Sequence, residues 1–331
     1  MLRLPPFNYL RPDSLGEAIS LLAEYGDTAS LVAGGTDLYP NMKRRQVEPQ
    51  VLIGLSGIAE LSGITGDAAT GLTIGSATKL QAVAPQPALK AAAPALAMAA
   101  SLVATPQLRH MGTIGGNLCL ATRCRYYNQS HDWRRAIGFC LKGAGNTCQV
   151  APGSARCWAV CSSDTAPALW SLGAKVRLVG PDGARQIPLA ELYQDDGISH
   201  LAKAPTEILT AICLPPAAGW RSTYLKLRRR DSFDFPVLGV AVALKLEDNI
   251  VKAGKIVLGA VGSCPREARE AADLLLNRPL ADELIAKVAM TAVKIAKPLD
   301  NTDLTSSYRR KMVRQFVARA LGQLGSAASD N

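Results

Sequence analysis

Six of the eight cysteines in this 331-residue chain lie within one stretch of 43 residues. The six are Cys119, Cys124, Cys140, Cys148, Cys157 and Cys161. A disulfide scaffold is typical of short secreted chains, whereas clustered thiols in a reducing compartment favour a metal site. The stretch also lacks helical and strand periodicity, so metal ligands would replace a hydrophobic core in ordering it. We therefore expect a metal-ordered loop over residues 119–161.

The spacing of these cysteines leaves two kinds of metal site open. Four thiolates that converge on one point satisfy either a [4Fe–4S] cluster or a structural zinc ion. Zinc ligands usually come in closely spaced pairs, whereas the gaps between Cys124, Cys140, Cys148 and Cys157 are wide and uneven. The spacing favours an iron–sulfur cluster, with zinc as the alternative.

Two glycine pairs form a second constraint. Gly34-Gly35 follows an apolar run at 30–33, and Gly115-Gly116 stands just before the cysteines. Without side chains there, backbone N–H groups can approach an anion closely, and Thr36 adds a hydroxyl donor. Two such turns on one domain could clamp a diphosphate, although each could also be only a tight turn. Neither matches the Gly-x-Gly-x-x-Gly fingerprint, so a Rossmann cofactor site is not indicated.

The elements expected around these turns form a first domain over residues 1–180. Ser14 and Glu17 read as a capping box that opens a helix. The apolar runs at 30–33 and 51–55 are predicted to be neighbouring strands, which completes a small α/β subdomain over about 1–55. A second subdomain, about 56–180, contains the cysteine insertion. Its expected elements are a strand at 71–75, a helical region at 88–104, a helix at 164–172 and a strand at 174–179.

A different pattern follows a turn near residue 180, where we place a domain boundary. Strands are expected near 206–214, 223–231, 236–246 and 253–261, and they would form an antiparallel sheet. Helices are expected at 266–277, 280–296 and 303–322. The last carries Tyr308, Met312, Phe316 and Ala320 at i+4 spacing, which predicts its buried face. The fold class is therefore α+β, with residues 181–331 as a C-terminal domain of an antiparallel sheet and helices.

The net charge of +10 allows several kinds of partner, and the sequence narrows them. Aromatic residues make up 5% and are not interleaved with basic runs, so nucleic-acid binding is not expected. Half of the net charge lies in the cysteine stretch, where six cations face Asp132 alone. These are Arg123, Arg125, Arg134, Arg135, Lys142 and Arg156. A basic surface of this kind would attract an acidic electron carrier, and positive charge near a cluster stabilises its reduced form.

Other function classes find little support. No apolar run is long enough for a membrane span, and the first residues lack the pattern of a signal peptide, so we expect the cytoplasm. The three histidines are far apart, and no nucleophile–base arrangement is visible. Cofactors rather than side chains would therefore carry the chemistry.

The order of these motifs resembles the FAD-binding subunits of the molybdenum hydroxylases, the xanthine dehydrogenase and carbon monoxide dehydrogenase relatives. The motifs are Ala33–Leu38, Ile74–Thr78 and Gly112–Asn117, and the likeness covers nearly the whole chain. It implies that FAD binds here and that the two glycine loops hold its diphosphate. The loop residues concerned are Leu31, Val32, Ala33, Gly34, Gly35, Thr36, Asp37, Leu38, Thr113, Ile114, Gly115, Gly116 and Asn117.

The same resemblance implies further FAD contacts at Asp164 and Lys226. Each residue also has an ordinary structural interpretation. Asp164 stands where a helix N-cap is expected, and Lys226 stands in a strand whose side chains could face solvent.

The cysteine stretch resembles one branch of this family, the flavin subunits of 4-hydroxybenzoyl-CoA reductases. Asn117–Cys124, Tyr127–Ser130, Trp133-Arg134 and Cys140–Lys142 carry the likeness. It implies a [4Fe–4S] cluster held by Cys124, Cys140, Cys148 and Cys157, with Cys119 and Cys161 as buried thiols.

This branch also implies an assembly. Its partners would be a large molybdopterin subunit and a small subunit with two [2Fe–2S] clusters, in a dimer of heterotrimers. Reduced ferredoxin would supply electrons for reductive dehydroxylation to benzoyl-CoA.

Two other functions remain open from the sequence. One is the flavin subunit of an oxidising molybdenum hydroxylase with zinc in the loop. The other is a basic, zinc-stabilised binding module without a redox role.

Overall fold

The chain begins with a small parallel sheet in this computed structural model, which describes residues 2–326. The sheet has the order β1 (Asn8–Leu10), β3 (Val51–Gly54), β2 (Ala29–Val32), so the two predicted neighbouring strands do pair. Helix α1 (Leu15–Tyr25) packs against it through Ala18 and Leu22. The Ser14 hydroxyl accepts a hydrogen bond from the Glu17 amide at 3.2 Å, which confirms the predicted cap. Helix α2 (Leu38–Lys43) follows the first glycine pair.

The second sheet is antiparallel and has five strands in the order β4 (Ile64–Asp67), β5 (Gly71–Gly75), β8 (Ile208–Leu214), β6 (Lys175–Gly180), β7 (Gly183–Pro188). Short helices pack against it. They are α3 (Leu80–Val83), α4 (Pro87–Ala92), α5 (Pro94–Ser101), α7 (Ile114–Leu118) and α9 (Thr165–Ser171), and α6 (Pro106–Met111) packs on α3. The helical region predicted at 88–104 is divided at Pro94, which has no amide hydrogen to continue the first helix.

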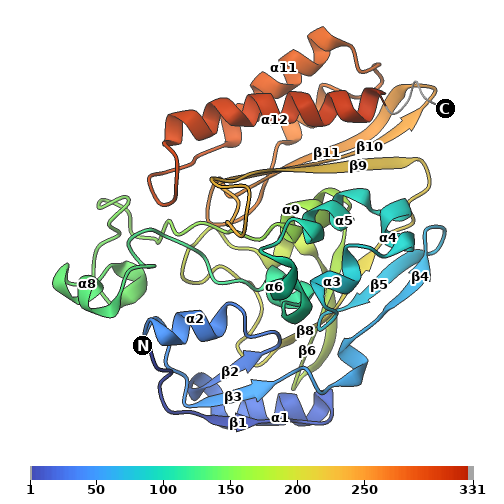
Figure 1. The fold of residues 1–331 in the computed structure, drawn as a ribbon. Coiled ribbons are helices and arrows are strands. Elements are labelled where there is room, and N and C mark those ends of the chain that lie inside the picture. The colour runs from blue at the N-terminus through green and yellow to red at the C-terminus, as the bar shows by residue number, and fades with distance from the viewer. Residues whose placement is uncertain (1, 327–331) are drawn as a thin grey trace.

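The third sheet, in the order β12 (Arg266–Glu267), β11 (Ile250–Gly259), β10 (Leu238–Glu247), β9 (Trp220–Leu227), is also antiparallel. Helices α10 (Arg269–Asp273), α11 (Asp282–Ala292) and α12 (Ser306–Ser326) pack with it around one apolar core. The opposite face rests on α5 and α9, so this sheet lies between two layers of helices (Figure 1).

One prediction about the C-terminal half was wrong, and a second was only partly right. The strand expected at 206–214 is β8, and it lies between β5 and β6 rather than in the last sheet. The buried face predicted for α12 is confirmed in part, because Ala320 is fully buried and Met312 and Phe316 pack against the core, whereas Tyr308 is 43% exposed. The centre of the buried face is formed by Arg309, Val313, Val317 and Leu321. The domain boundary near residue 180 stays a prediction, and the place of β8 favours a boundary after Leu214.

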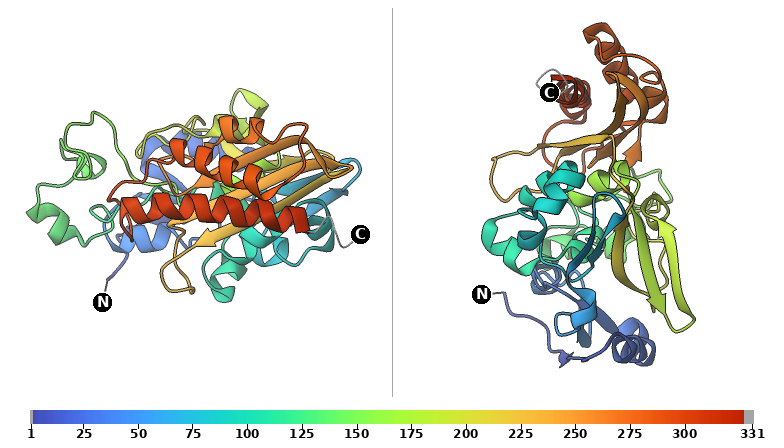
Figure 2. Two further views of the ribbon diagram at one scale, coloured as in Figure 1. Left: turned by 90° about the horizontal axis from the view of Figure 1, so that it is seen from above. Right: turned by 90° about the vertical axis from the view of Figure 1, so that its right-hand side faces the viewer.

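The cysteine stretch forms an arm that projects from the body, as Figures 1 and 2 both show. The stretch was predicted to be irregular, but it contains one short helix, α8 (His131–Ala136). The Ser130 hydroxyl caps this helix by accepting a hydrogen bond from the Trp133 amide. Its base is hydrogen-bonded to segments far away in the sequence. The Gln46 side chain donates to Tyr127, and the Asn301 side chain donates to Trp158. No helix within residues 2–326 has both the length and the apolar character that a membrane span needs.

Candidate functional site

A cavity of about 630 Å³ lies between the first two sheets, and both glycine segments form its wall. Every loop residue that the sequence predicts for FAD lines it, except Ile114, which is buried in the core of the second sheet. Asp164 lines it as well, whereas Lys226 does not. A cavity of this size is in the range that holds a cofactor.

Glycine is needed at these positions because other parts of the protein lie too close for a side chain. A side chain at Gly34 would clash with the carbonyl oxygen of Met111, and its Cβ would lie 2.9 Å from the Cα of Gly112. A Cβ at Gly115 would lie 2.6 Å from that of Ser76. Gly35 has a φ of +68°, in the left-handed region that favours glycine. The two glycine segments are therefore packed side by side along one edge of the cavity.

The second glycine segment, predicted as a tight turn, forms the first turn of helix α7. The Thr113 hydroxyl accepts a hydrogen bond from the Gly116 amide at 3.1 Å, which caps the helix. The side-chain oxygen of Asn117 accepts hydrogen bonds from the hydroxyls of Ser163 and Thr165 at 2.8 and 2.7 Å. Asn117 therefore fixes the start of α9 against the cavity wall.

Asp164 and Lys226 form one buried ion pair. The Lys226 ammonium lies 2.9 Å from the Asp164 carboxylate, and the Tyr224 hydroxyl donates to the same carboxylate at 2.8 Å. Burial raises the pKa of the Asp164 carboxyl and lowers that of the Lys226 ammonium, in opposition to their mutual attraction. Lys226 is not a solvent-facing strand residue, and the Asp164 side chain makes no N-cap hydrogen bond to α9. The pair joins α9 at the cavity to β9 of the third sheet.

Arg123 is a cavity residue that the sequence reasoning missed. Its guanidinium forms an ion pair with Asp37 of the first glycine segment and lies 4.4 Å from the centre of the Phe235 ring. Burial lowers its pKa to about 10. Its Nε is buried and has no hydrogen-bond partner among the described residues, so it is a donor available to an anionic ligand. Its position directly before Cys124 could have marked Arg123 as a candidate site residue. Only the fold shows that its side chain points to the cavity.

The cavity therefore fits FAD by its chemistry. The Nε of Arg123 is a buried donor without a partner among the described residues, and the backbone of the two glycine segments can be approached closely. An extended, anionic cofactor requires both features.

The cysteines divide into two groups. Cys124, Cys140 and Cys157 share a buried cluster with Tyr127 and Ala159. Cys148 is also buried, and its proximity contributes to the raised pKa of both Cys124 and Cys157. Cys119 and Cys161 belong instead to the core of the second sheet. The four thiols predicted as ligands thus lie in one region, apart from the two predicted as bystanders.

These thiols are free and are not arranged as a finished metal site. Within residues 2–326, no group of three or more histidine, cysteine, aspartate or glutamate side chains is arranged to hold a metal ion. Burial raises the pKa of Cys124 and raises that of Cys157 to about 11. The donor set fits a thiolate-bound metal or cluster, but the thiols become good ligands only when positive charge replaces their protons. Their role as ligands stays a prediction.

The cations of the arm point inward or are paired, so the predicted basic docking surface is largely absent. Arg123, Arg134 and Lys142 have little exposure or lie among buried groups. Arg156 pairs with Asp195 at 2.9 Å and stacks on the Trp158 ring. Only Arg125 and Arg135 are clearly exposed, and they pair with Asp300 and Asp132.

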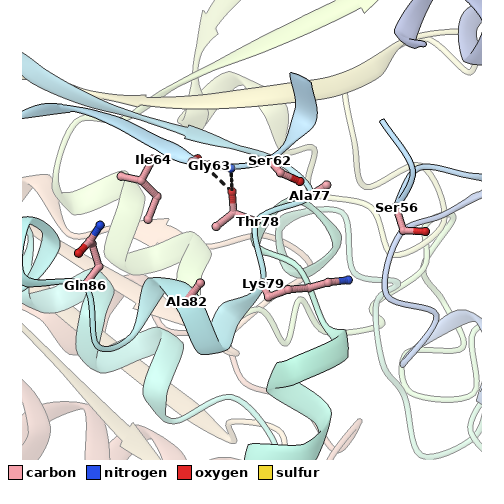
Figure 3. Close-up of a pocket in the computed structure, with 9 residues that line it drawn as sticks. All are labelled: Ser56, Ser62, Gly63, Ile64, Ala77, Thr78, Lys79, Ala82 and Gln86. Carbon is pink, nitrogen blue, oxygen red and sulfur yellow. Dashed lines mark hydrogen bonds between the residues drawn. The ribbon is translucent and has the colours of Figure 1, made fainter. Parts of the chain in front are cut away.

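A second hollow of about 360 Å³ opens beside the cavity and shares Ala77 with it (Figure 3). Thr78 holds its rim by hydrogen bonds to the amide and carbonyl of Gly63 at 2.9 and 3.1 Å. Lys79 is the one charged residue among those lining it, and its ammonium donates to the carbonyl of Met111. The hollow contains no residue that the sequence predicts for the cofactor.

Known proteins resemble this chain over nearly its full length. Residues 5–217 match the family model described as FAD binding domain in molybdopterin dehydrogenase, and residues 222–324 match the CO dehydrogenase flavoprotein C-terminal domain. The carbon monoxide dehydrogenase medium chain of Afipia carboxidovorans is 30% identical over 98% of both chains. The aldehyde oxidoreductase FAD-binding subunit of Escherichia coli is 33% identical over 88% of this chain and 94% of its own. A solved carbon monoxide dehydrogenase from Hydrogenophaga pseudoflava superposes with a TM-score of 0.80 at 29% identity, covering 97% of both chains.

Proposed function

Because the chain belongs to the FAD-binding subunits of the molybdopterin dehydrogenase family, we propose that it serves a complex of the 4-hydroxybenzoyl-CoA reductase type. The chain is an FAD-binding oxidoreductase subunit of the molybdenum hydroxylase family. The finer proposal is carried by one observation: four buried thiols lie together in the arm, and the first of them, Cys124, directly follows the cavity-lining Arg123.

FAD, when bound, supplies a carrier that can exchange one or two electrons. The chain's own residues bind and orient it. In the proposal, Gly34, Gly35 and the start of α7 approach its diphosphate, and the free Nε of Arg123 donates to it. The buried Asp164–Lys226 pair keeps the cavity wall fixed to the third sheet, although direct contacts of these two residues with FAD stay a prediction.

Cys124, Cys140, Cys148 and Cys157 are the proposed ligands of a [4Fe–4S] cluster. Their burial and their separation from Cys119 and Cys161 support this choice. A cluster here would add a one-electron carrier close to the flavin. The proposed activity is electron relay between ferredoxin and molybdenum, for removal of a phenolic hydroxyl to give benzoyl-CoA.

The proposed partners are a molybdopterin-containing large subunit and a small subunit with two [2Fe–2S] clusters, in a dimer of heterotrimers. The names of the relatives support this, because a medium chain is one part of a larger assembly. Ferredoxin is the proposed donor at the arm. Since few cations there are free, the exposed apolar side chains of Trp133 and Ile137 would contribute to its docking.

A second function is favoured by the relatives themselves. Relatives named as carbon monoxide dehydrogenase and aldehyde oxidoreductase indicate an oxidising molybdenum hydroxylase with another substrate, in which the cysteines would hold zinc. A binding module without redox chemistry is not supported, because the chain belongs to an FAD-binding family.

Anaerobic purification of the complex separates these functions. The proposal predicts flavin, iron and sulfide in this chain, and turnover of 4-hydroxybenzoyl-CoA with a low-potential donor. Zinc in place of iron, with oxidation of an aldehyde or a heterocycle instead, would establish the second function.

A further inference from the structure

The side chain of Lys142 enters the interior of the arm and ends among neutral oxygens. Its ammonium donates to the carbonyl oxygens of Thr122 and Gly197 at 3.1 and 2.8 Å, and also to the Thr122 hydroxyl. It lies 5.2 Å from the centre of the Tyr127 ring. None of these partners carries a negative charge.

Two of the groups that contact this ammonium also pack against the cysteine site. Tyr127, whose ring it faces, packs with Cys124, Cys140 and Cys157. Gly197, whose carbonyl oxygen it contacts, touches Cys157 on its other side, since a Cβ at Gly197 would lie only 2.7 Å from that sulfur.

No carboxylate among the described residues pairs with Lys142 to neutralise it, in contrast to Lys226, which has Asp164. A buried charge without a counter-charge is costly, and proteins retain one where an opposite charge is expected. Thiolates bound to a metal centre supply that charge, because a coordinated thiol is deprotonated.

We propose that Lys142 is the counter-charge of the four-cysteine site and raises the reduction potential of the [4Fe–4S] cluster. The inference rests on the proposed function, since it requires the cluster. Each electron that the site accepts adds negative charge, and a fixed cation nearby favours the reduced form. Lys142 would therefore not touch a substrate. Its charge would act on the cluster that the cysteines hold.

The competing interpretation is structural: Lys142 would only tie Thr122 to Gly197 through hydrogen bonds. Two substitutions separate charge from hydrogen bonding. Lys142→Arg keeps the charge, whereas Lys142→Gln keeps donors and removes the charge. Arg135→Gln is the matched control, because it removes an exposed cation from the same arm.

The test measures iron, sulfide and flavin content and the cluster midpoint potential, by redox titration followed by EPR, in the intact complex. We expect Lys142→Gln to lower the equilibrium constant for reduction at least tenfold, which is about 59 mV for one electron. Lys142→Arg and Arg135→Gln should stay near wild type. Loss of the cluster in Lys142→Gln but not in Lys142→Arg would also support a charge role.

Two results would overturn the inference. One is a full cluster in Lys142→Gln with the wild-type potential, and the other is loss of the cluster in both Lys142 variants, which would assign the residue to packing. Absence of iron from the wild-type complex is a different failure. It would refute the proposed function before any variant is compared.

Discussion

Single residues carry the strongest constraints in this molecule, and several lie outside the motifs that the sequence displays. Gly197 is the clearest, because its carbonyl oxygen meets Lys142 while its missing side chain leaves room for Cys157. Nothing in the sequence around it distinguishes it from any other glycine in a turn. Its role follows from an approach of two segments that are about 40 residues apart.

We predict that Gly197→Ala displaces Cys157. The new Cβ would lie 2.7 Å from the cysteine sulfur and from the Ala159 amide nitrogen, so the loop has to shift. We expect loss of most of the bound iron, retention of FAD, and destabilisation of roughly 1–3 kcal/mol, as for other overpacked sites. Gly153→Ala in the same arm is the control, because no atom lies within 4 Å of its Cβ position. Equal iron in both variants would contradict the prediction.

The buried ion pair gives a second prediction. Asp164→Asn leaves the Lys226 ammonium buried without a counter-charge, which costs about 3–5 kcal/mol in comparable cases. Urea denaturation should show this loss, together with weaker retention of FAD. Glu270→Gln, which breaks the exposed Lys294–Glu270 pair, should change stability by less than about 1 kcal/mol. The prediction is wrong if the two variants are equally stable.

At the scale of single residues, the sequence could predict which side chains have a chemical role, but not where those side chains point. The glycine segments, the four cysteines and Asp164 were all marked by residue type and by resemblance, and the fold brings them to one cavity and to one arm. That Asp164 and Lys226 touch could not be predicted from residues 62 positions apart. The inward turn of Arg123 and Lys142 was equally hidden, since a cation in a loop is usually solvated.

At the scale of helices and strands, periodicity predicted the elements well and their partners less well. The strand at 206–214 exists, but its apolar side chains fit either neighbouring sheet, so its place between β5 and β6 depends on tertiary packing. The α12 helix exists as well, but its buried face includes Arg309, which a hydrophobic pattern cannot include. The Arg309 guanidinium donates to the carbonyl oxygens of Val237 and Leu299, so it is buried with its hydrogen bonds satisfied.

The buried face of α12 can be tested by comparing how much two substitutions lower the free energy of unfolding. Leu321→Ala removes a fully buried side chain and should destabilise the chain by about 2–5 kcal/mol. Tyr308→Ala, on the face that the sequence predicted, should cost no more than about 0.5 kcal/mol, because that side chain is exposed. Thermal or urea unfolding followed by circular dichroism compares them. A larger loss for Tyr308→Ala would restore the predicted face.

The whole molecule combines a family cavity with an arm that has its own chemistry. The fold and the sequence match the relatives over nearly the full length. Three segments that are far apart in the sequence contact the base of the arm, namely those at Gln46, Gly197 and Asn301. These contacts hold the cysteine stretch against the rest of the molecule. Arg123 joins the two parts, with its backbone beside Cys124 and its guanidinium on Asp37 at the cavity. This arrangement brings the proposed cluster near the proposed flavin site.

We propose that one chain carries both FAD and a [4Fe–4S] cluster, the latter on Cys124, Cys140, Cys148 and Cys157. Iron, sulfide, zinc and flavin, measured together in the anaerobically purified complex, test it in wild type, Cys140→Ser and Cys161→Ser. We predict that the wild type and Cys161→Ser contain the cluster and FAD, and that Cys140→Ser keeps FAD but loses the cluster. Iron that depends on Cys161 and not on Cys140, or zinc alone in the wild type, would contradict it.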